Sequence, residues 1–304
     1  MNFDFGEVLS RTWQITWKHK VLWVYGFLQT MAGFLFLPLV LVPVFAPLIF
    51  GRSGGLGRVV TEPWFFLIVI PGFLVFLLAL YPLGVLVNGA LSIGALHAER
   101  GDEKLSFMEL VRESLPFFWR LLGVMLLFTI GMMLAMFILN TLHAVLSVVT
   151  LGIASICLAP LSFLIYPAMF VWYVCLEQAM AAIVVDNMNV TEAAQQGWQV
   201  FRNNIASVAM IGLVLYFGVS LIGMVAIMPM MVPFFAVPFA IVVEEFNRTI
   251  LVVAGVCATI YLPLFAVFQG AMIALMKSGW ILTYLRLTRS PKLQPLPGTV
   301  EATS

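Results

Sequence analysis

The stretch DFGEVLSRTWQITWK, residues 4–18, begins with the pattern of a capped helix. Asp4 offers a side-chain oxygen to the free N–H groups of the first turn, and Glu7, three residues later, completes the pattern of a capping box. After the cap, every fourth residue is large and apolar: Phe5, Leu9, Trp13 and Trp17. Charged and polar residues occupy the other face. The sequence therefore predicts an amphipathic helix at the start of the chain.

The rest of the chain is far more apolar than this first helix. Hydrophobic residues make up 62% of the 304 residues and charged residues 10%, whereas a soluble domain has about 25% charged residues. Residues 21–50 and 205–243 contain no ionisable side chain apart from Tyr25 and Tyr216, and about 20 apolar residues suffice to cross a bilayer. These runs predict an all-α polytopic membrane protein. The chain has no basic stripe outside the apolar segments, so no nucleic-acid partner is expected.

The apolar runs predict six transmembrane helices arranged as three hairpins. The predicted pairs are 21–49 with 64–97, 119–140 with 151–184, and 204–230 with 250–287. We expect the second hairpin to turn near Asn140, and the prolines at 229, 233 and 238 to give a broken or re-entrant segment. Residues 1–288 form a single transmembrane domain in this interpretation, and the polar, proline-rich residues 289–304 form a disordered cytoplasmic tail.

The opening pattern occurs three times. SFMELVRESLPFFWR at 106–120 and NVTEAAQQGWQVFRN at 189–203 repeat a cap residue followed three positions later by a glutamate. The second helix of each hairpin also carries a related motif, with Tyr-Pro at 81–82 and 166–167 and Tyr-Leu-Pro at 261–263. The sequence thus predicts repeats over about 4–100, 106–185 and 189–288. Pro116 is expected to shorten the helix that opens the second copy.

The distribution of positive charge predicts the orientation in the membrane. Two crossings return the chain to the side where it began, so the three opening helices and both termini share one side. Of the fifteen Lys and Arg residues, all but Arg52, Arg58 and Arg248 fall on that side. Excess positive charge marks the cytoplasmic face. We therefore expect a multi-pass protein of the cell inner (plasma) membrane with cytoplasmic N- and C-termini.

A helix with tryptophan on one face and charge on the other favours the plane of the membrane interface. The residues expected to make the interfacial contacts are Trp13, Trp17, Lys18, Trp119, Arg120, Trp198 and Arg202. Two interpretations stay open. The three helices anchor each hairpin at its depth, or they form a cytoplasmic ring that binds membrane lipids or a partner protein. The interspersed glutamates weigh against a preference for anionic lipids.

Polar side chains within the spans are candidates for function because they are costly in a bilayer. The candidate intramembrane polar site comprises Asn88, Tyr173, Glu177, Gln269 and Lys277. Asn88, Tyr173 and Gln269 occupy equivalent positions of the three repeats, so they form a polar patch or small-solute site, or else they bond across packed helices. Glu177 is interpreted as a proton or cation site, as a side chain that reaches the interface, or as the partner of Lys277, which we favour.

No arrangement of residues typical of catalysis occurs in the chain. The histidines at 19, 97 and 143 are isolated in the sequence, and motifs for zinc, phosphate or a nucleophilic serine are missing. The three cysteines lie in apolar segments without metal-binding spacing. We therefore expect a protein that is not an enzyme and that carries no cofactor.

The opening unit FDFGEVLSRTWQITWKHKVLWVYGFL, residues 3–28, resembles the start of a broad bacterial group of six-span membrane proteins of unassigned function. That group is similar to the membrane domain attached to some glycerophosphoryl diester phosphodiesterases. The resemblance implies the six-span fold but no catalytic residue, because the hydrolase activity of that family belongs to a separate barrel domain. Two functions stay open: an interaction or envelope-organising module that uses the cytoplasmic helices, and a small-solute or lipid transporter with a site between repeats near the bilayer midplane.

Overall fold

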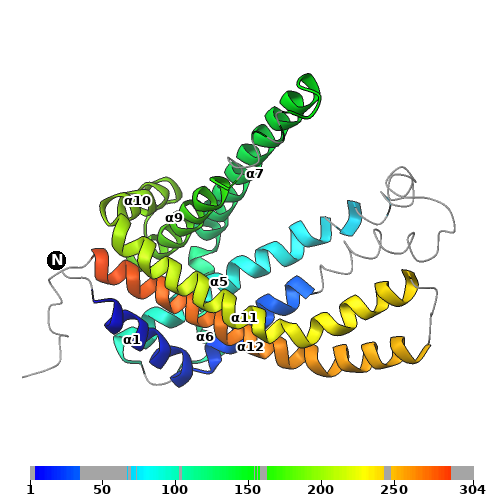
Figure 1. The fold of residues 1–304 in the computed structure, drawn as a ribbon. Coiled ribbons are helices and arrows are strands. Elements are labelled where there is room, and N and C mark those ends of the chain that lie inside the picture. Colours follow the sequence, from blue (N-terminus) through cyan, green and yellow to red (C-terminus); the bar gives the residue numbers. More distant parts are fainter. Residues whose placement is uncertain are drawn as a thin grey trace, which may run out of the picture. The chain divides into compact units, whose positions relative to one another are not determined.

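The computed structural model describes residues 4–34, 67, 70–72, 74–102, 105–153, 155, 157, 163–242 and 248–288. In these ranges the chain is helical between short turns and no strand occurs. Figure 1 labels the principal helices. The residues between the first two predicted spans, the second half of the predicted first span and the predicted tail 289–304 lie outside the described residues.

Several of the described helices meet the length and apolarity that a bilayer crossing requires. There are five in the described ranges, namely Leu78–Arg100, Phe107–Val149, Ile165–Asp186, Ile205–Pro229 and Thr259–Thr288. A shorter apolar helix, Val21–Phe34, begins where the first span is predicted. By length and composition, this is a multi-pass helical membrane protein.

The three capped segments all begin helices, but their caps differ. Helix α10 (Val190–Asn203) has the full capping box, in which the backbone N–H of Asn189 donates to Glu192 Oε2 over 3.2 Å. In α1 (Phe5–Lys18) only half of the predicted box forms, because the Glu7 N–H donates to Asp4 Oδ1 over 3.0 Å while the Glu7 carboxylate has another partner. Helix α6 (Phe107–Ser114) has no side-chain cap bond.

The second copy of the pattern is shortened where Pro116 was expected to act. Helix α6 has 8 residues, whereas α1 and α10 have 14 each. A short 3₁₀ helix, η2 (Leu115–Phe117), follows α6 and contains Pro116. Proline lacks the N–H that an α-helix requires at this point, so the backbone tightens before the long helix α7 begins.

Helix α7 (Phe118–Val149) is longer than predicted. The turn expected near Asn140 is wrong, because the Asn140 side chain donates to the carbonyl of Met136 over 2.7 Å and the helix continues. The chain turns instead at residues 150–152, where Leu151 and Gly152 have φ of 51° and 90°. An asparagine side chain favours a turn when it hydrogen-bonds to nearby backbone in a non-helical conformation. Here it donates instead to the carbonyl four residues earlier in the same helix, and the helix is retained. Helix α9 (Ile165–Asp186) follows.

The break expected at the three prolines near residue 233 is also wrong. Helix α11 runs from Ile205 to Val242 without interruption. Prolines are tolerated in membrane helices because neighbouring backbone adjusts locally. Helix α12 (Arg248–Thr288) likewise contains Pro263 in its interior. At Pro82 the adjustment is visible, since a π-helix, η1 (Phe76–Leu80), directly precedes α5 (Tyr81–Arg100).

The chain divides into two compact units. Unit 1 comprises Met1–Thr12, Trp119–Leu213 and Gly279–Ser304. Within it, α10 packs directly on α9, because a Cβ at Gly197 would lie 2.5 Å from the Cys175 carbonyl oxygen. The α7–α9 contact is fixed by Trp172, whose indole N–H donates to the Phe128 carbonyl over 3.0 Å. Glycine at these contacts lets helix backbones approach closely.

Unit 2 comprises Trp13–Phe118 and Val214–Ser278. The helix Val21–Phe34 crosses α12 at two glycines, and a Cβ at Gly26 would lie 2.2 Å from the Gly270 carbonyl oxygen. The same helix contacts α6 through Tyr25, which stacks on the Phe107 ring at 4.6 Å and donates to the Phe107 carbonyl over 2.5 Å. A close glycine crossing and a part-buried hydrogen bond thus join the helices of this unit.

Candidate functional site

Three tryptophans of unit 2 form one cluster where α1 meets the helix Val21–Phe34. The Trp13 and Trp17 rings lie 5.3 Å apart, and the Trp17 and Trp23 rings meet edge to face at 4.8 Å. The indole N–H of Trp23 donates to the Thr16 carbonyl over 2.7 Å and so holds the helix Val21–Phe34 against α1. We call Trp13, Trp17 and Trp23 the tryptophan cluster.

The buried face of α1 is not the face that carries the tryptophans. Val8, Thr12 and Ile15 are each at most 2% exposed, whereas Trp13 and Trp17 are 52% and 44% exposed. Large aromatic rings left this exposed on an amphipathic helix that precedes an apolar one are typical of the membrane–water interface. The two faces of α1 therefore have different roles: one packs and the other presents indole rings.

The other two opening segments also present tryptophan. Trp119 is 75% exposed and Trp198 is 51% exposed, while Lys18 and Arg202 are exposed beside their own tryptophans. Arg120 differs from the other predicted contact residues, because its guanidinium donates to Asn187, over 3.0 Å to the carbonyl and 2.5 Å to Oδ1. Arg120 thus fixes the turn between α9 and α10 within unit 1.

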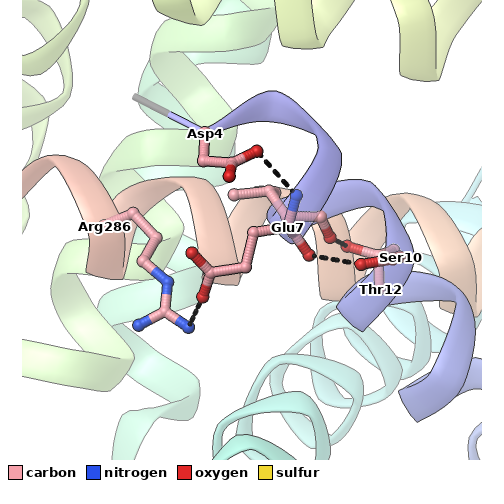
Figure 2. A network of polar contacts seen from close by, with 6 residues as sticks. Asp4, Glu7, Ser10, Thr12 and Arg286 are labelled. Carbon is pink, nitrogen blue, oxygen red and sulfur yellow. Dashed lines mark hydrogen bonds and ion pairs between the residues drawn. The ribbon is translucent and has the colours of Figure 1, made fainter. Parts of the chain in front are cut away.

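Three glutamates of the opening helices have internal partners, whereas Glu109 of α6 is exposed. In unit 1 the Glu7 carboxylate pairs with Arg286 at 2.8 Å, as Figure 2 shows, and the Glu192 carboxylate accepts from the backbone of Asn189. In unit 2 the Glu113 carboxylate lies 3.2 Å from His97 Nε2. The negative charge of these three glutamates is therefore engaged inside the protein.

His97 is not isolated as the sequence indicated. Its Nδ1 lies 3.2 Å from Asp102 Oδ2 and its Nε2 lies 3.2 Å from Glu113 Oε2. A neutral imidazole has one N–H, so both contacts act as hydrogen bonds only when the ring is protonated. The sequence hid this group because Glu113 comes from the following helix, sixteen positions along the chain.

Three residues of the predicted intramembrane polar site belong to unit 2. Asn88 is buried and its amide donates to the Gly84 carbonyl of its own helix over 2.8 Å. Gln269 lies beside α11, where a Cβ at Gly223 would be 3.8 Å from both of its amide atoms. Lys277 is buried near the end of the unit. Asn88 thus satisfies its donor locally, as polar side chains in helices often do.

The other two predicted residues belong to unit 1. Tyr173 meets the Trp280 ring edge to face at 6.2 Å, and Glu177 is buried one turn further along α9. The polar patch that joins the three repeats and the ion pair between Glu177 and Lys277 each combine residues of both units. Both stay predictions.

The structure adds polar residues that the predicted site did not include. Gln178 is fully buried, and among the described residues neither its amide nitrogen nor its amide oxygen has a hydrogen-bond partner. Its position next to Glu177 in an apolar run was the available signal. Near the end of α12, the buried Tyr284 hydroxyl donates to Asp186 Oδ2 over 2.5 Å. No local sequence pattern could have predicted this hydrogen bond, because the two residues are 98 positions apart in the chain.

The described residues hold no group of three or more His, Cys, Asp or Glu side chains arranged to bind a metal ion. The polar contacts instead form hydrogen bonds and ion pairs that hold helix ends together. In comparisons with known proteins, no family model, no curated protein and no solved structure matches this chain.

Proposed function

We propose that this chain is a non-enzymatic, multi-pass protein of the cell inner membrane that acts as an interaction or envelope-organising module. Its working surface is made by α1, α6 and α10, which lie at the cytoplasmic interface. Six spans in three repeated hairpins carry these helices, as in the bacterial six-span group that the opening sequence resembles. We propose that the chain is a member of that group.

One observation supports the proposal above all others. Exposed tryptophans occur at each of the three opening segments; α6 and α10 lead into long apolar helices, and α1 leads into the shorter apolar helix Val21–Phe34. Indole rings favour the membrane interface, where their apolar body and polar N–H are both accommodated. A helix held there exposes its outer face to head groups and to cytoplasmic proteins, which is the position that an interaction module requires.

The orientation is tested by labelling engineered cysteines in a variant without the native cysteines. Gln14, Arg112 and Gln195 are exposed on α1, α6 and α10, and Leu151 is the matched control at the turn after α7. An impermeant maleimide should reach the first three cysteines only from the cytoplasmic side and residue 151 only from the other. Labelling of residues 112 and 195 from opposite sides would refute the repeat.

The module itself is tested by placing a photoreactive amino acid at the same four positions in native membranes. The proposal expects defined protein adducts from Gln14, Arg112 or Gln195 and none from Leu151. If no adduct forms at the three helices, and purified protein in vesicles carries out solute flux, the module is refuted.

A transporter is the second candidate, and Gln178 favours it. A fully buried amide without partners costs about 1–3 kcal/mol, and such a group calls for an explanation. A polar solute that bonds to this amide would provide one. If the protein is a transporter, replacing Gln178 with Leu abolishes solute flux in reconstituted vesicles. If it is an interaction module, the same variant still forms protein adducts at the cytoplasmic helices.

A further inference from the structure

We propose that the tryptophan cluster, together with Lys18 and Lys20, is a binding site for the head group of an anionic phospholipid. This inference rests on the proposed function, which places α1 at the membrane interface. It adds a ligand class to that placement, because an interfacial helix by itself need not distinguish one phospholipid from another.

The turn between α1 and the next helix positions the two lysines. The backbone N–H groups of Leu22 and Trp23 donate over 3.0 Å to the carbonyls of His19 and Lys20 respectively, which closes the turn tightly. His19 is buried within it, while Lys18 and Lys20 on either side are exposed. Two exposed lysines therefore stand on either side of one buried histidine in the sequence, at the point where an interfacial helix becomes a span.

The local charge favours an anion. From residue 8 to residue 61 the sequence contains no aspartate or glutamate, and the nearest acid of α1, Glu7, already pairs with Arg286 at 2.8 Å. Three of the interspersed glutamates, which in sequence argued against anionic lipids, thus have internal partners in the fold, and the exposed Glu109 lies on α6 rather than on α1. Each basic residue near an anionic surface strengthens lipid attraction, so two lysines without an adjacent acid give a clear preference.

The tryptophan cluster supplies the apolar part of the site. The Trp23 N–H donates to the Thr16 carbonyl, which fixes that ring, and the exposed Trp13 and Trp17 rings offer apolar surface on the helix that ends at Lys18. Aromatic rings alone would suit a quaternary ammonium such as choline. The lysines oppose that choice, because they repel a cation. The combination of fixed rings and two lysines therefore matches a phosphate head group without a compensating positive charge.

The test uses the full chain in nanodiscs that contain equal amounts of phosphatidylglycerol and phosphatidylcholine. p-Benzoylphenylalanine replaces Val24, which is exposed and directly follows Trp23. After irradiation, mass spectrometry measures the ratio of the two lipid adducts. We expect phosphatidylglycerol to dominate, and K18Q/K20Q to lower the ratio roughly 30-fold. The matched control R100Q/R112Q removes two exposed charges of the same unit and should leave the ratio unchanged.

The possible failures differ from one another. Equal adducts of both lipids, or an excess of phosphatidylcholine, would overturn the proposed site while the interfacial placement of α1 stands. Equal losses in K18Q/K20Q and R100Q/R112Q would overturn it too, because general surface charge would then explain the preference. If residue 24 forms no lipid adduct of either kind, the interfacial placement itself fails, and the proposed function fails with it.

Discussion

The packing of α10 on α9 predicts that Gly197→Ala separates the two helices. A Cβ at this position would lie 2.5 Å from the Cys175 carbonyl oxygen and 2.9 Å from the Ala179 backbone nitrogen. Ordinary van der Waals contact begins at 3.4 Å, so α10 would have to move by about 0.9 Å. Both obstructing atoms belong to the backbone of α9, and no side-chain rotation relieves the contact.

The expected cost follows from two opposing effects. Overpacking a tight contact costs about 1–3 kcal/mol, and a rigid backbone places this site at the upper end. Replacing glycine with alanine within a helix returns up to about 1 kcal/mol. The net destabilisation of the docked α10 is therefore about 2 kcal/mol, which raises the population of the undocked helix roughly 30-fold.

Hydrogen exchange measured by mass spectrometry on the purified protein in nanodiscs reports this opening locally. We expect peptides of α10 to lose roughly 30-fold in protection, while peptides of α12 are unchanged. Gly218→Ala in α11 is the matched control, because its Cβ would meet nothing within 4 Å. Protection of α10 that stays at the wild-type level in the Gly197→Ala protein would refute the close approach of the two helices.

Three further substitutions test other contacts, each through thermal unfolding of the purified protein. Gly270→Ala should destabilise unit 2 by about 2 kcal/mol, because it meets the backbone of the Gly26 helix; an unchanged midpoint would contradict that crossing. Tyr284→Phe removes the hydroxyl that donates to Asp186 and should cost about 2 kcal/mol, so unaltered stability would show that the bond does not form. Gln178→Leu should raise stability by about 1 kcal/mol by removing an unpaired buried amide; a clear loss would show that the amide has a partner.

The sequence predicted those features that depend on neighbouring residues. The apolar runs predicted helices long enough to cross a bilayer, and five occur among the described residues. The cap residues Asp4, Ser106 and Asn189 predicted where three helices begin, and Pro116 predicted the short one. Capping and proline effects act within one turn, so local sequence is enough to reveal them.

Features that depend on competition between local signals were predicted less well. Asn140 and the prolines near residue 233 are residues typical of turns and breaks, yet α7 and α11 continue through them. In an apolar environment the backbone has no water to bond with, so the helix is retained wherever its groups can still be satisfied. The partners of His97 and Asp186 were missed because they come from distant positions in the chain.

The sequence by itself determined that the chain is helical, apolar and punctuated by three segments that begin with a cap residue and carry tryptophan. Only the tertiary structure decided which faces pack: α1 buries Val8, Thr12 and Ile15 rather than its tryptophans. It also decided that Gly197 lies on the backbone of α9. The reason is physical. Lipid tails are as apolar as a protein core, so hydrophobicity cannot separate the lipid-facing side of a membrane helix from its packed side. Shape and close backbone approach make that choice, and they exist only once the helices meet.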